Sequence, residues 1–184
     1  MIARPVIAIA IATMMLAGCS DQGEGEKPAA AKNQSANGTV AATVADSPKH
    51  RTLAAALSDT RLAPVLDGKG VYTLLAPNDA AFTALGDRGT TLADAEHRPL
   101  MIAVLRAHLL PGEVTPESIE KAIARENGPV EMRTMAGGAV RFSKGERGIV
   151  VGNGESEAVF SGTPRTASNG AVLPIDKVLL PGRD

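Results

Sequence analysis

The spacing of apolar residues changes once within the chain, and this change constrains the fold more than any other feature. Between residues 49 and 128, leucine, isoleucine and valine recur at intervals of three and four, as on one face of a helix. From residue 130 to 180 they alternate with polar residues, as in half-buried strands. Helices followed by strands with short turns predict an α+β fold with a mainly antiparallel sheet. Residues 49–182 are numerous enough for one domain that buries about two-thirds of its unfolded surface.

Capping residues and prolines mark the helix boundaries in the first part of this domain. Thr52 is expected to cap a helix that Pro64 divides into two short ones. The apolar run at 71–76 predicts a buried strand, and Asn78 or Asp79 is expected to cap the helix after it. Two more helices are expected, one with Pro99 in its first turn and one from Thr115-Pro116-Glu117 to Asn127-Gly128.

Glycine-rich turns separate short alternating segments in the second part. Val140 and Phe142 are expected on the inward face of one such segment. Pro174 cannot donate a backbone hydrogen bond, so it is expected at a sheet edge or a bulge. The expected strands are 130–134, 139–143, 149–151, 158–160 and 171–180.

The first 19 residues have the order of a secretory leader. A single charge at Arg4 precedes the uncharged run 6–17, which is too short to span a bilayer of about 30 Å and has the length of a signal-peptide core. Leu16-Ala17-Gly18-Cys19 resembles the lipobox of bacterial lipoproteins, which implies cleavage after residues 1–18 and lipidation of Cys19. Ser20 then favours anchoring at the outer membrane rather than the inner membrane, with the domain in the periplasm or at the cell surface.

Residues 20–48 carry few apolar side chains. Val40 and Val44 are the only larger ones, and such a segment cannot bury enough surface to offset the entropy of ordering. We therefore predict a signal peptide at 1–18, a lipidated cysteine with a flexible tether at 19–48, and a folded domain at 49–182.

Charge and cysteine content exclude several classes of protein. Nineteen basic and 20 acidic side chains give a formal net charge of −1, whereas a non-specific nucleic-acid binder needs a basic excess. We expect no nucleic-acid partner. Cys19 is the sole cysteine, so no intramolecular disulfide can form and the core alone must hold the domain together.

The sequence shows no constellation of catalytic or metal-binding residues. The histidines, at positions 50, 97 and 108, lack the paired spacing of a metal site, and His50 and His97 are expected to be solvated. Gly154-Glu155-Ser156 lacks the final glycine of a nucleophile elbow. We expect no metal, no cofactor and no enzyme activity.

His108, Leu109, Leu110 and Pro111 form the candidate binding segment. The leucines and the proline are expected to form an exposed ridge beside His108, because an apolar patch next to a polar rim can mark a contact site. In the alternative interpretation, His108 is semi-buried, hydrogen-bonds backbone carbonyls and fixes the turn.

Three segments, in order, resemble the fasciclin family. Residues 72–82 resemble its first signature, a strand that runs through Pro77 into a helix with an inward Phe82. Residues 105–112 resemble its central Tyr-His segment, and residues 167–181 its closing signature. The resemblance implies a β-wedge or sandwich with flanking α-helices, in a surface-attached protein associated with adhesion and with matrix or partner binding.

Within these segments, several residues are expected to be structural. Asp79 is expected to cap a helix, Asn169-Gly170 to form a turn, and an inward Asp176 to find hydrogen-bond donors inside the fold. The chain departs from the family where Ala107 replaces a frequent Tyr and where Leu173-Pro174 replaces His-Val.

These observations together favour a lipid-anchored, non-enzymatic fasciclin module of the cell envelope that mediates adhesion or binds protein, matrix or polysaccharide. The alternative is a carrier that holds a small apolar ligand between the sheet and the helices.

Overall fold

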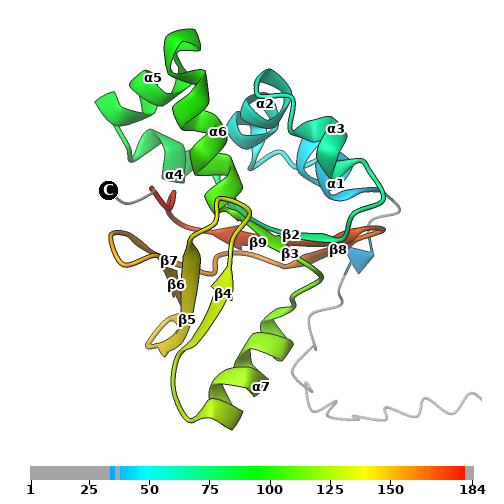
Figure 1. Ribbon diagram of the computed structural model, residues 1–184, viewed down its shortest axis with the longest axis vertical. Helices are drawn as coiled ribbons and strands as arrows, with labels where there is room; N and C mark the ends of the chain where they lie inside the picture. Colours follow the sequence, from blue (N-terminus) through cyan, green and yellow to red (C-terminus); the bar gives the residue numbers. More distant parts are fainter. Residues whose placement is uncertain (1–33, 36–37, 181–184) are drawn as a thin grey trace, which may run out of the picture. The chain divides into compact units, whose positions relative to one another are not determined.

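Two β-sheets organise the part of the chain that this computed structural model describes, residues 34–35 and 38–180 (Figure 1). The five-stranded sheet has the order β1-β8-β9-β2-β3 and the four-stranded sheet the order β4-β5-β6-β7. The signal peptide predicted at 1–18 and Cys19 lie outside the described residues. The strands are β1 (Gln34–Ser35), β2 (Tyr72–Pro77), β3 (Leu109–Pro111), β4 (Val130–Arg133), β5 (Ala139–Gly145), β6 (Gly148–Gly152), β7 (Glu157–Val159), β8 (Arg165–Ala167) and β9 (Gly170–Ile175).

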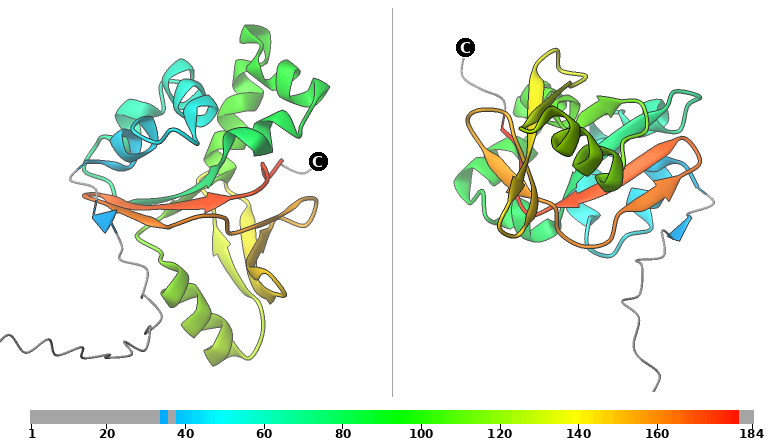
Figure 2. Two further views of the ribbon diagram at one scale, coloured as in Figure 1. Left: turned by 180° about the vertical axis from the view of Figure 1, so that it is seen from behind. Right: turned by 90° about the horizontal axis from the view of Figure 1, so that it is seen from below.

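The helices divide between the two sides of the five-stranded sheet. Helices α1 to α6 lie on one side, whereas α7 and the four-stranded sheet lie on the other (Figure 1, Figure 2). None of the helices within residues 38–180 is long and apolar enough to cross a membrane. Their bounds are α1 (Val40–Ala45), α2 (Arg51–Asp59), α3 (Ala63–Leu66), α4 (Asp79–Thr83), α5 (Asp87–Ala93), the 3₁₀ helix η1 (Ala95–His97), α6 (Arg98–Ala107) and α7 (Pro116–Glu126).

The five-stranded sheet is buried on both faces. In β2, Leu74 packs into the core under helices α1 to α6, and its neighbour Leu75 packs into the core against the four-stranded sheet. Val172 and Leu173 of β9 divide between the two cores in the same way. Since all positions of β9 and all but the first of β2 are buried, both strands appear in the sequence as nearly continuous apolar runs.

The predicted α+β class is confirmed, and the strand pairings are mostly antiparallel. Two pairings are parallel: β1 with β8, and β2 with β9 at the centre of the five-stranded sheet. The hairpins of the second half follow the predicted alternation, and Val140 and Phe142 of β5 are both buried.

Pro174, predicted at a sheet edge or a bulge, lies in the central strand β9. Its carbonyl accepts a hydrogen bond from the N–H of Ser161 at 2.8 Å, so its backbone polar groups point away from β2. On that side β8 pairs with β9 only as far as Val172. The missing N–H of Pro174 therefore interrupts no pairing with β8.

Several predicted helix boundaries are confirmed. The segment around Pro64 forms two short helices, α2 and α3. Thr115 caps α7 in a reciprocal arrangement with Ser118, and Asn127 ends this helix in the left-handed conformation.

The start of α2 is not capped as predicted. His50, not Thr52, occupies the N-cap position, and its side chain makes no capping bond. Instead, Oδ1 of Asp79 accepts the N–H of Thr52 at 2.8 Å. Asp79 does not cap its own helix, because Asn78 performs that role by accepting the N–H of Ala81. The cap of α2 is thus supplied by a residue remote in sequence, which local patterns do not show.

The tether predicted to extend to residue 48 is wrong for its last part. Residues 40–45 form helix α1, with Thr39 as its cap. Val40 and Val44 are four residues apart, so they lie on one face of this helix, and both pack into the core under the helices. Ala41 and Thr43 of this helix are also buried, so α1 docks through most of its side chains.

Replacing Val40 by Ala is expected to lower the free energy of unfolding by about 2 kcal/mol, because it removes two buried methyl groups and leaves a cavity. Val40 is 0% exposed. The matched control is Val65→Ala in α3, where the side chain is 48% exposed and the expected change is within about 0.5 kcal/mol. Urea unfolding measures both, and equal effects would contradict the docking of α1.

Candidate functional site

The candidate segment His108–Pro111 lies largely inside the protein. His108 is the C-cap of α6, and the next three residues form β3, paired antiparallel with β2. Leu109 and Leu110 are 3% and 0% exposed, and only Pro111 is exposed. The predicted exposed ridge is therefore wrong. Leu109 enters the core under the helices and Leu110 the core against the four-stranded sheet, because consecutive strand residues point to opposite faces and both faces are covered.

Both ring nitrogens of His108 are hydrogen-bonded within the fold. Nε2 accepts the N–H of Leu179 at 3.0 Å, so Nδ1 carries the proton and donates to the carbonyl of Val104 at 2.8 Å. These bonds join the end of α6 to the segment that follows β9. His108 is 1% exposed. Of the two interpretations given above, a binding residue or a structural one, these contacts support the structural one.

The environment of His108 keeps the ring neutral. Burial lowers the pKa of His108 to about 4, although the carbonyl of Val104 acts in the opposite direction. A proton added at Nε2 would also face the N–H of Leu179, which this nitrogen now accepts. His108 is therefore uncharged at neutral pH.

The other histidines differ from each other in exposure. His97 is exposed as predicted, but the solvation predicted for His50 is wrong, since its side chain is 6% exposed. Nδ1 of His50 lies 2.7 Å from Oγ of Ser47, and Nε2 has no hydrogen-bond partner in the described part of the chain. Burial lowers the pKa of His50, and the charge of Asp79 and the carbonyl of Ala76 oppose this shift.

Asn169 connects the amino-terminal helices to the closing strand. Its Oδ1 accepts the N–H of Val40 at 2.8 Å, and its Nδ2 donates to the carbonyls of Leu66 at 2.7 Å and Gly68 at 3.1 Å. The next residue, Gly170, begins β9 with φ +145°, and a Cβ there would lie 1.7 Å from the carbonyl oxygen of Tyr72. This close approach of two backbones requires glycine.

The remaining motif residues also serve the fold. Oδ1 of Asp176 accepts the N–H of Val159 at 2.7 Å, and Oδ2 lies 3.7 Å from Nη2 of Arg147. Asp176 thus has a backbone donor inside the fold, as expected. Pro77 ends β2, and Phe82 packs into the core under the helices.

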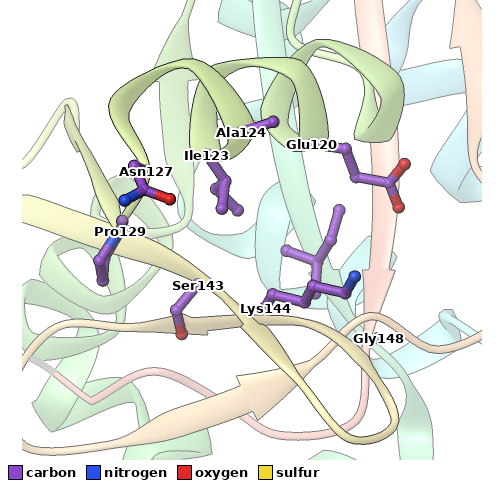
Figure 3. Close-up of a pocket in the computed structure, with 10 residues that line it drawn as sticks. Glu120, Ile123, Ala124, Asn127, Pro129, Ser143, Lys144 and Gly148 are labelled. Carbon is purple, nitrogen blue, oxygen red and sulfur yellow. The ribbon is translucent and has the colours of Figure 1, made fainter.

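Helix α7 borders two surface grooves. The groove between α7 and the β5–β6 hairpin has a volume of about 560 Å³ and includes Ile123 and Ile149. Figure 3 shows Ile123 pointing from the helix into this groove, with Glu120 and Lys144 toward one end and Asn127 and Pro129 toward the other. A second groove of about 730 Å³ lies between α7 and β4. Within residues 38–180, no three His, Cys, Asp or Glu side chains are grouped so that they could hold a metal ion.

The comparison with known proteins agrees with the resemblance found in the sequence. The model of the Fasciclin domain family matches residues 48–181. The chain belongs to the fasciclin family. It is similar to Protein sll1483 of Synechocystis sp. (strain ATCC 27184 / PCC 6803 / Kazusa), with 28% identity over 145 residues that cover 78% of this chain and 73% of the relative.

A solved structure shows the same fasciclin fold. It is the FAS1 domain pair from the insect cell adhesion molecule Fasciclin I, with a TM-score of 0.69 and 18% identity. The match covers 78% of this chain and 51% of the solved chain, so this chain spans about half of the domain pair.

The two departures from the family pattern lie inside this fasciclin domain. Ala107, in place of the frequent Tyr, is 8% exposed, and Leu173, in place of the His, is 1% exposed. Both positions are therefore filled by apolar side chains of the cores. Neither offers a polar group at the surface.

Stability is expected to fall as the pH is lowered from about 7.5 to about 5, partly through His108. Its folded-state pKa of about 4 lies below the ordinary histidine value of 6.5, so the unfolded state binds more protons within that window. The linkage relation gives about 2 kcal/mol of lost stability at about pH 5. The pKa of His50 is also lowered, and His50 is present in both the wild type and the His108 variant compared below.

The variant His108→Gln is expected to remove about that part of the pH dependence, because its amide can accept and donate but does not titrate. Urea unfolding of the wild type and the variant at the two pH values measures the difference. The same pH dependence in both proteins would show that His108 does not contribute.

Proposed function

We propose that this fasciclin domain is a lipid-anchored, non-enzymatic module of the cell envelope that mediates adhesion or binds protein, matrix or polysaccharide. The observation that carries the proposal is the family match over residues 48–181, since fasciclin domains are known in adhesion-related proteins. The solved FAS1 pair comes from a cell adhesion molecule. A fold can host different functions, and turnover by the purified protein in an esterase or glycosidase panel would contradict this one.

The surface around α7 is the part of the domain best suited to contact a partner. Of the residues of α7, only Ile119 is buried, so most of the helix surface faces the two grooves or solvent. The groove toward the β5–β6 hairpin combines the apolar Ile123 and Ile149 with the charged Glu120 and Lys144. An apolar centre with a polar rim is the usual composition of a protein interface.

A small apolar ligand in the same groove is the second candidate function. Its volume of about 560 Å³ lies within the usual range for ligand pockets, about 300–1,000 Å³. Native mass spectrometry of the purified protein separates the two functions. A small mass that co-purifies and is lost from Ile123→Asp supports the carrier, whereas a clean apo mass supports the interaction module.

Anchoring is expected to depend on Cys19. Replacing Cys19 by Ser removes the thiol that carries the lipid, and two or more acyl chains are what make membrane attachment stable. The variant is expected to leave the membrane fraction and to lose incorporation of radiolabelled palmitate, while the wild type sediments with the outer membrane. Palmitate labelling of the Cys19→Ser protein would contradict lipidation at this residue.

Reversing the charge of Lys144 is expected to reduce partner capture at least about tenfold, because it places like charges beside Glu120 on the rim of the groove. Lys69→Glu is the matched control, since Lys69 is also exposed but lies outside both grooves of α7. Crosslinking in intact cells, with partners identified and quantified by mass spectrometry, compares the variants. Equal recovery of every crosslinked partner from both would exclude this groove.

A further inference from the structure

A separate cavity, of about 310 Å³, lies away from α7 and gathers polar side chains that lack hydrogen-bond partners among the described residues. Four buried side-chain atoms in the described part of the chain have no hydrogen-bond partner, and all four residues line this cavity. The atoms are Oγ1 of Thr43, Nε2 of His50, Oγ of Ser161 and Nε of Arg165. Buried polar groups are nearly always hydrogen-bonded, so four orphans in one place need an explanation.

The four residues come from separate parts of the fold. Thr43 lies in α1, His50 at the start of α2, Ser161 after β7, and Arg165 at the start of β8. Thr43 and His50 are 2% and 6% exposed, whereas Lys49 beside them is exposed. The cavity is thus a pocket with buried polar walls and an opening to solvent.

The chemistry of the walls favours negative charge. Lys49 and Arg165 both line the cavity, and no aspartate or glutamate does so within the described residues. Among the described residues Arg165 makes no ion pair; its Nη1 donates to the carbonyl of Thr43 at 3.3 Å, and its Nε has no hydrogen-bond partner. Guanidinium and hydroxyl groups are strong donors to carboxylate and phosphate oxygens.

His50 can complete this set of donors. When the hydroxyl of Ser47 donates to Nδ1, the proton of the neutral ring is on Nε2, the unpaired nitrogen at the cavity. Asp79 is the carboxylate whose charge acts on His50. It accepts the N–H of Thr52 and does not line the cavity. His50 occupies the N-cap position of α2, but its side chain makes no capping bond to that helix.

We propose that this cavity binds a small molecule through an anionic oxygen group, a carboxylate or a phosphate. Arg165 and His50 donate to the anion from the wall, the hydroxyls of Thr43 and Ser161 complete its shell, and Lys49 adds charge at the mouth. The site goes beyond the proposed adhesion function, because it uses none of the residues around α7.

The test is NMR titration of the ¹⁵N-labelled full chain in detergent with inorganic phosphate, glucuronate and neutral glucose, at constant ionic strength. Saturable shifts at the amides around residues 43, 161 and 165 with phosphate or glucuronate, but not with glucose, support the site. Response to only one of the two anions identifies the group that is recognised. No saturable shift with either anion, or an equal response to glucose, overturns the proposal.

Two variants and a control make the test specific to the cavity. Arg165→Gln is expected to weaken anion binding about tenfold or more, because a charged donor is lost. Thr43→Val has nearly the same shape and is expected to weaken binding while leaving the unfolding temperature unchanged or raised. Arg141→Gln, the same change at an exposed position in β5, is expected to leave binding unchanged. Unaltered affinity in both Arg165→Gln and Thr43→Val overturns the proposal.

Discussion

The parallel pairing of β2 with β9 joins two strands that are far apart in the sequence, and both cores depend on it. The register runs from Tyr72 opposite Gly170 to Pro77 opposite Ile175. A parallel pair requires a long crossover between its strands, and here the whole segment 78–169 forms that connection. The entropy of closing so long a loop is offset because the paired strands bury side chains on both faces. Gly170 permits the closure, since any side chain would collide with the backbone of Tyr72.

This central pairing determines where function can lie. β3 pairs with β2 at the edge of the same sheet. His108, Leu109 and Leu110 are therefore buried by the layers that cover the two faces of this sheet. Residues there stabilise the fold and cannot meet a partner. Residues that do not hold the sheet together are found in two places. One is the surface around α7, a helix with one buried residue, and the other is the polar cavity beside α1 and β8.

Features with a local cause could be predicted from the sequence. The capping of α7 by Thr115 and the alternation of Val140 and Phe142 need only neighbouring residues, and both are present in the structure. The change from helical to alternating spacing also predicted the α+β class, and the family resemblance agreed with it. Features that depend on distant partners could not be predicted: two valines do not indicate a helix until a core receives α1, and a three-residue strand does not show that both of its faces are covered.

His50 and His108 show why burial alone does not separate a structural from a functional side chain. Both are buried, and burial lowers the pKa of both rings. His108 has a partner for each nitrogen, so its contacts account for its presence. Within the described residues, Nε2 of His50 has no partner that meets the geometry of a hydrogen bond, as for three other polar groups at the same cavity, and Asp79 caps the helix that begins there. An apolar side chain at such a position would avoid the cost of an unpaired polar atom. When a chain breaks local rules at several residues around one cavity without an internal gain, a ligand that supplies the missing hydrogen bonds is the consistent physical explanation.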